Sequence, residues 1–213
     1  SGGPGFRENG GVAMTRVHSE SGAINILNVI IMLVLLIALG FAFELSAALD
    51  QQNAQTNDCS AARDATMASQ NLLVAKNSDD PGLAIAAAAV KSLRANGFNG
   101  EVEVWFYEAP SSAVPQSKRA WAWGIQTKSS LKGYFATYSL GDFNIPIGSH
   151  VTAHAVPYTA GKAWRPADSG NGKYSFKAGS DTPEYEEYTS TKELPQEVID
   201  EMKTAVNQAT NNK

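Results

Sequence analysis

The sequence predicts an α+β protein in which a long N-terminal helix and a second helix pack on a small antiparallel β-sheet head. Three observations lead to this prediction. Residues 24–43 form an uncharged apolar run, and the chain then continues to Lys76 without proline or glycine. Residues 82–97 form an alanine-rich segment with helix-start and helix-stop residues at its ends. From Gly100 onward, short segments alternate apolar and polar residues, which is the pattern of strands.

Composition excludes several classes of function. The 213 residues carry a net charge of −4, so no basic surface that would attract nucleic acid is predicted. Three histidines and one cysteine are too few for the usual zinc frameworks, and no catalytic or nucleotide-binding motif occurs. We therefore expect no enzyme activity, no cofactor and no bound metal. Cys59 is interpreted as an apolar filler on a helix or, alternatively, as a site of intermolecular pairing.

The first 22 residues are interpreted as a leader or a disordered segment, because they are rich in glycine and serine and show no apolar periodicity. Met14 offers an alternative start, which would give the short leader MTRVHSESG. Three fates of the apolar run are open: a permanent anchor, a signal peptide cut after Ala48, or a cut between Gly22 and Ala23 that leaves the helix on the mature protein.

The apolar run is long enough to cross a membrane. Its 20 residues span about 30 Å as a helix, which matches the hydrocarbon thickness of a bilayer. Its strongly polar residues, Asn25 and Asn28, lie at its N-terminal end. Arg7 and Arg16 precede the run, whereas no lysine or arginine follows it until Arg63 and the nearest charges after it are Glu44 and Asp50. The positive-inside rule therefore places the N-terminus in the cytoplasm and the rest outside.

Residues 23–76 are predicted to form one apolar and stalk helix. Small and aliphatic residues recur at intervals of three and four along its second half: Leu45, Ala48, Leu49, Ala61, Ala62, Ala65, Ala68 and Leu72. The alternative is two helices with a break at residues 53–58, where asparagine, threonine and aspartate lower helix propensity.

The second helix is predicted to begin at Pro81, with Asp80 as its N-cap, and to end before Gly97. Its predicted apolar face consists of Leu83, Ala86, Ala87, Val90 and Leu93.

Four strands are predicted to form an antiparallel meander against whose apolar face the helices pack. They are residues 101–107, 119–127, 133–140 and 150–158, with residues 141–148 as a loop. The head domain is accordingly placed at residues 77–160.

Two groups of side chains in these strands are candidate sites. His150 and His154 lie about 13 Å apart along a strand, which is too far to share a metal, so both are expected to be exposed. The aromatic residues could form a binding platform or the core of the sheet: Trp105, Trp121, Trp123 and Tyr134.

Residues 161–213 are predicted to be a polar extension that ends in a short helix. A Gly-Asn-Gly turn signal suggests a hairpin involving Trp164, Tyr174 and Phe176. Pro195 begins the final helix, whose apolar stripe consists of Leu194, Val198, Met202 and Val206. Glutamates 184, 186 and 187 are interpreted as solvated charge.

The layout resembles bacterial type IV pilin-like proteins, most closely the TadE-like minor pilins (pseudopilins) of tight-adherence pili. The matching residues are Glu20-Ser21-Gly22 followed by AINILNVIIMLVLLIALGFAFE, and the alanine-rich AIAAAAVKSLRANGF before the first strand. The resemblance implies that a prepilin-type peptidase cuts between Gly22 and Ala23. The exposed helix then packs with other copies or related pilin subunits.

One position departs from the family pattern. Pilins usually carry glutamate five residues after the cut, where this chain has Leu27 with Asn25 and Asn28 nearby. Asparagine can hydrogen-bond between helices, but it cannot neutralise a neighbour's free amine. We expect a structural filament subunit that resides in the inner membrane before assembly, with Asn25, Leu27, Asn28 and Glu44 at helix contacts. The alternative is a single-pass membrane-anchored extracytoplasmic binding domain.

Overall fold

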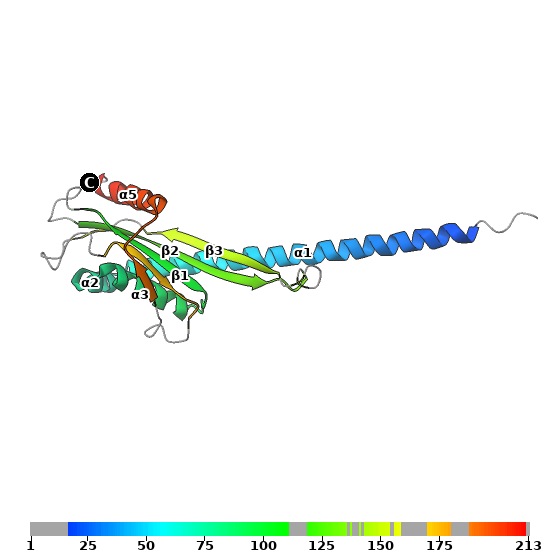
Figure 1. The fold of residues 1–213 in the computed structure, drawn as a ribbon, viewed down its shortest axis with the longest axis horizontal. Helices are drawn as coiled ribbons and strands as arrows, with labels where there is room; N and C mark the ends of the chain where they lie inside the picture. The colour runs from blue at the N-terminus through cyan, green and yellow to red at the C-terminus, as the bar shows by residue number, and fades with distance from the viewer. Residues whose placement is uncertain are drawn as a thin grey trace, which may run out of the picture.

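In the computed structural model, a long N-terminal helix packs through its C-terminal half on an antiparallel sheet, and its N-terminal half projects away from the head (Figure 1). The structure describes residues 17–110, 119–135, 137, 141, 143–153, 156–158, 170–179 and 188–211. The helices are α1 (Val17–Thr66), α2 (Ser69–Asn77), α3 (Pro81–Ala95) and α5 (Gln196–Asn211). The strands are β1 (Glu101–Glu108), β2 (Arg119–Lys132), β3 (Asn144–Thr152), β4 (Val156–Tyr158), β5 (Gly172–Phe176) and β6 (Tyr188–Thr191). The α+β prediction is therefore confirmed.

The strands pair in the order β3-β2-β1-β5-β6, and β4 also pairs with β2. All these pairings are antiparallel, with Val104 opposite Ile125 on one side of β1 and opposite Tyr174 on the other. The described strands are thus not a simple meander, because β5 returns from late in the chain to lie beside β1.

One face of the sheet is covered by α1 and α3. Alternate residues of β1 and β2 are fully buried there, as the sequence predicts: Val102, Val104, Phe106, Trp121, Trp123 and Ile125. Ala86, Val90 and Leu93 of α3 are buried against them, but Ala87 is exposed and Ile85 is buried in its place. The predicted face of α3 is therefore wrong at Ala87, because the helix is rotated toward Ile85 in its contact with the sheet.

The opposite face of the sheet is covered by α5 (Figure 1). Met202 and Val206 are buried against small residues of β2, Ala120 and Ala122. A Cβ on Gly124 would lie 2.9 Å from Cε of Met202, so the absence of a side chain there permits close approach. The predicted apolar stripe of the final helix is confirmed, and its partner is the second face of the sheet.

The helix prediction for residues 23–76 is wrong in its last part, because α1 ends at Thr66 and α2 begins at Ser69. Thr66 Oγ1 donates a hydrogen bond to the carbonyl of Arg63 (2.6 Å), and Asn71 Nδ2 donates to that of Ala65 (2.7 Å). The Asn71 side chain thereby occupies the Ala65 carbonyl, to which the Ser69 amide would donate if the helix continued. The alternative break at residues 53–58 is also wrong, since Thr56 Oγ1 bonds the Gln52 carbonyl within the helix.

The predicted third strand at residues 133–140 is wrong, and β3 begins inside the predicted loop. Strand β2 continues to Lys132, which pairs with Asn144. Between these strands, the described residues Tyr134, Phe135 and Thr137 are helical, and the Thr137 amide donates to the Gly133 carbonyl (3.0 Å). A longer hairpin therefore replaces one predicted strand.

The predicted hairpin at the Gly-Asn-Gly turn is also wrong. Strand β5 pairs with β1 and with β6, whose residues come well after it in the chain. Tyr174 and Phe176 are buried through this pairing. Trp164, His154 and glutamates 184, 186 and 187 lie outside the described residues.

The capping of α3 confirms the sequence prediction. The Asp80 carboxylate accepts a hydrogen bond from the Leu83 amide (2.9 Å), and Pro81 occupies the first turn. Gly97 follows the C-cap with φ +88°, a conformation that favours glycine. Tyr174 adds a tertiary bond to this cap, because its hydroxyl donates to Asp80 Oδ1 (2.6 Å).

We expect the free energy of unfolding to fall at alkaline pH because of Tyr174. Burial raises its pKa, and so does the nearby Asp80 carboxylate. An unfolded tyrosine ionises at about pH 10, whereas Tyr174 in the folded chain keeps its proton above that pH. The contribution of Tyr174 to the free energy of unfolding is therefore fully present below about pH 10 and is lost as the pH rises further.

Urea unfolding of the full chain across this range checks the prediction, with Tyr174→Phe as the comparison. The variant should lose stability less steeply above about pH 10. Burial also raises the pKa of Tyr107, so the free energy of unfolding should still fall somewhat with pH in both proteins. Parallel pH profiles for the two proteins would contradict the role of Tyr174.

Candidate functional site

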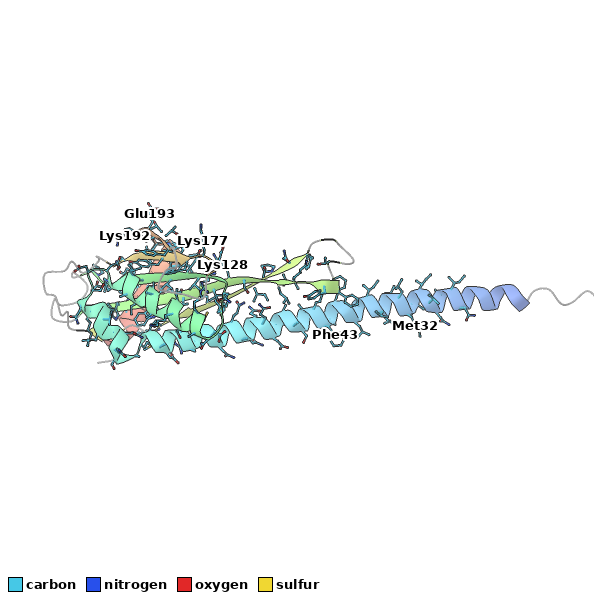
Figure 2. The ribbon with its side chains drawn as sticks, turned by 90° about the horizontal axis from the view of Figure 1, so that it is seen from below. Met32, Phe43, Lys128, Lys177, Lys192 and Glu193 are labelled. Carbon is cyan, nitrogen blue, oxygen red and sulfur yellow. The ribbon has the colours of Figure 1, made fainter. Side chains whose placement is uncertain are left out.

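The most unusual surface of this chain is the N-terminal half of α1. Described side chains from Asn25 to Leu39 are exposed, and they point to every side of the helix. Figure 2 shows Met32 and Phe43 on the projecting helix, far from the labelled charged residues of the head. We call residues 24–43 the apolar segment. A helix that is apolar all round is stable when it is surrounded by lipid or by other helices.

The described residues include one helix long and apolar enough to cross a membrane, and that helix is α1. The predicted packing residues Asn25, Leu27 and Asn28 are exposed near its start. Asn25 and Asn28 are three residues apart and so lie on neighbouring parts of one face. Their amides can donate and accept hydrogen bonds, which suits contacts between helices in an apolar environment.

The predicted processing residues Gly22 and Ala23 lie within α1, whose helical backbone begins at Val17. The cut between them stays a prediction. Glu44 is placed differently from the other packing residues. It is partly buried against its own head, where its carboxylate accepts a hydrogen bond from the Phe135 amide.

The C-terminal half of α1 is attached to the sheet through small and polar side chains. The residues buried on this face recur along the helix: Gly40, Ala48, Gln55, Cys59, Ala62 and Thr66. Gln55 Nε2 donates to Ser129, Ser149 Oγ donates to Thr56 Oγ1 (3.0 Å), and Trp123 Nε1 donates to Thr66 Oγ1 (2.9 Å). The head is therefore attached to α1 by close packing on its small residues and by side-chain hydrogen bonds.

The predicted stripe of the stalk is consequently wrong at several positions. Leu45 and Leu49 are exposed, as are Ala61 and Ala68, although Ala48 and Ala62 are buried as predicted. The reason is the polar character of β2 and β3 opposite the helix, where Thr127 and Ser149 are buried. The aliphatic side chains face outward and extend the apolar surface beyond residue 43.

Cys59 lies in the core beneath α1, which confirms its interpretation as a filler. Its side chain is fully buried, and its sulfur lies 3.4 Å from Thr127 Oγ1. Burial raises the pKa of the thiol, which keeps it protonated and unreactive at neutral pH.

The other candidates from the sequence do not form a chemical site among the described residues. No group of three acidic, histidine or cysteine side chains that could hold a metal occurs there. His150 is exposed, as expected, and its ring lies 3.4 Å from Glu201 of α5. Trp105, Trp121 and Trp123 are buried, so the platform interpretation is wrong for them. Tyr134, in contrast, is 75% exposed.

Comparison of the chain with protein-family models, curated proteins and solved structures gives no match. The features that bear on function are therefore those of the chain itself. They are an apolar helix whose side chains from Asn25 to Leu39 are exposed and a head that packs on the C-terminal half of the same helix.

Proposed function

We propose that this chain is a structural subunit of an extracellular pilus-like filament or of its assembly complex, similar to the TadE-like minor pilins. The observation that carries the proposal is the division of α1 into two halves. Its C-terminal half is packed on the sheet, while the side chains from Asn25 to Leu39 are exposed on all sides of the helix. In a filament, helices of neighbouring subunits would surround that segment.

The energetic reason is the size of the exposed apolar surface. Removing one leucine-sized side chain from water stabilises a protein by about 1.5–3 kcal/mol. Many such side chains lie along the apolar segment, so either a membrane or a helix bundle would be strongly preferred to water. The membrane holds the segment before assembly, and other copies or related pilin subunits replace the lipid afterwards.

The continuity of α1 supports the same proposal. The helix runs without interruption from the apolar segment into the head. The orientation of a packed apolar segment would therefore set the orientation of its head, as a regular filament requires. With the N-terminus in the cytoplasm, the head lies outside the cell membrane, and a prepilin-type peptidase removes the leader.

The mass of the mature N-terminus tests the proposal. The full chain would be expressed in a bacterial host together with a prepilin-type peptidase, and its N-terminal peptide identified by mass spectrometry. We expect the mature protein to begin at Ala23. Gly22→Leu should block this cut, because the peptidase recognises the glycine, whereas Gly11→Leu is the matched control and should leave it unchanged.

Two other outcomes would contradict filament processing. A chain that retains the residues before Gly22 and remains monomeric in detergent would support the anchored binding domain. A chain that begins at Leu49 would indicate a secreted domain released after Ala48.

A further inference from the structure

The turn between β2 and β3 lies against α1 where the helix leaves the head (Figure 1). We call the described residues of this turn (Gly133, Tyr134, Phe135, Thr137, Gly141 and Phe143) the hairpin tip. A Cβ added to Gly40 would clash with the ring of Phe135, so the ring packs directly on the helix backbone. The bond from the Phe135 amide to Glu44 fixes the tip one helical turn further along.

These two contacts place the hairpin tip at the end of the apolar segment. Gly40 lies three residues before Phe43, the last residue of the apolar segment. Along a helix, Gly40 is therefore about 4.5 Å inside the C-terminal end of the segment. Glu44 is the first charged residue after the segment. If the segment spans a bilayer, the hairpin tip lies at the boundary between acyl chains and headgroups.

The side chains of the tip suit this depth. Tyr134 is 75% exposed, Phe143 43% and Phe135 38%, although the core of the head buries Trp105, Trp121 and Trp123. Aromatic side chains concentrate at the membrane–water interface, where an apolar ring and polar surroundings are both available. Lys132, at the end of β2, is exposed beside them and can reach lipid phosphates. Asp142, between Gly141 and Phe143 in the sequence, lies outside the described residues.

The backbone of the tip is also compatible with partial immersion, since unpaired amides are costly in an apolar environment. The Gly133 amide donates to the Phe143 carbonyl (3.1 Å), and the Gly141 amide donates to the Thr137 carbonyl (3.1 Å). The Thr137 and Phe135 amides are bonded as described above.

We propose that the hairpin tip inserts into the headgroup region of the membrane and forms a second attachment point beside α1. This inference rests on the proposed function, in that the apolar segment must span the membrane before assembly. The bilayer is the occupant because the exposed aromatics continue the surface of the segment at the depth where its hydrocarbon part ends. A second contact, displaced sideways from the helix, would restrict how the head tilts and rotates before it joins an assembly.

Depth measurement by fluorescence quenching tests the inference. The full chain would carry single cysteines in a Cys59→Ala background, each labelled with the dye NBD. It would be placed in phosphatidylcholine nanodiscs at fewer than one chain per disc. Quenching would be compared between lipids with a nitroxide near the headgroup and lipids with one near the acyl terminus. The positions are Tyr134→Cys and Phe143→Cys, with Leu35→Cys, Ser130→Cys and Lys177→Cys as controls.

We expect the labels at Tyr134 and Phe143 to be quenched mainly by the shallow nitroxide. Ser130 is exposed on the same hairpin but lies two residues before the end of β2, about 7 Å from Lys132 by strand rise and further from the membrane than the hairpin tip, so its quenching should be no more than about half as strong. Lys177, on the head, should show none. Leu35 should respond mainly to the deep nitroxide, which reports on the membrane span independently.

The controls separate the two proposals. Deep quenching at Leu35 without quenching at Tyr134 would overturn the inference and leave the span intact. Protection of Tyr134 from aqueous quenchers only when more chains are added would likewise overturn it, in favour of contact with a second copy. Absence of quenching at Leu35 would contradict the membrane span, and the inference would fail with it.

Discussion

Replacing Ile30, Leu33 and Leu36 together with aspartate is expected to remove most of the chain from the membrane fraction. These side chains are exposed near the middle of the apolar segment. An aspartate at the centre of a membrane helix costs about 3 kcal/mol relative to leucine, so three shift the insertion equilibrium by roughly 9 kcal/mol. Resistance of the chain to carbonate extraction measures the effect.

The matched control places three aspartates on the same helix beyond the segment, at Ala47, Asn53 and Asn57. All three positions are exposed. Aspartate contributes little to membrane orientation, so neither set of changes should invert the topology. The control chain should stay in the membrane fraction. Equal extraction of both variants would contradict the assignment of residues 24–43 as the membrane-spanning part.

Replacing Trp123 with alanine is expected to lower the free energy of unfolding by about 3–5 kcal/mol. Its side chain is fully buried between the sheet and α1, opposite Phe106 on β1. The change leaves a cavity and also removes the donor to Thr66 Oγ1, the residue at which α1 ends. Urea unfolding of the full chain in detergent, followed by far-UV circular dichroism, measures the loss.

Tyr134→Ala is the matched aromatic control for this experiment. The two residues belong to one aromatic set in the sequence, yet Tyr134 is 75% exposed. Its replacement should change the free energy of unfolding by no more than about 0.5 kcal/mol. A similar loss in both variants would mean that the hairpin tip contributes to the core of the head.

Local patterns predicted much of the fold correctly. The alternation in β1 and β2 identified the buried faces, and Asp80, Pro81 and Gly97 marked the ends of α3. Such signals succeed because capping and side-chain alternation depend on residues close together in the chain.

The errors occurred where distant residues decide the outcome. Residues 133–140 alternate like a strand, but Tyr134, Phe135 and Thr137 are helical, and the Phe135 amide donates a hydrogen bond to Glu44 of α1. The pairing of β5 with β1 joins residues about 70 positions apart, such as Val104 and Tyr174. No local pattern in the sequence specifies that pairing.

Part of the candidate site could likewise be predicted from local sequence, and part required the tertiary structure. The apolar segment and the polar residues at its N-terminal end are evident from composition alone, because a long uncharged run has few stable surroundings other than lipid or helices. The hairpin tip was not predicted, because no signal in the sequence places Tyr134 and Phe135 beside the apolar segment about 90 residues earlier in the chain. Finding it requires knowing that β2 extends to Lys132 and that Phe135, just beyond its end, packs on Gly40.

The sequence by itself determined that this protein has an apolar helix able to enter a membrane and a head of mixed helices and strands. Apolarity, periodicity and caps act within a few residues, so they can be recognised without the fold. Only the tertiary structure decided which half of α1 the head covers and which side chains it leaves exposed. That choice depends on polar contacts between α1 and strands far away in sequence, which turn Leu45 and Leu49 outward and hold Phe135 at the end of the apolar segment.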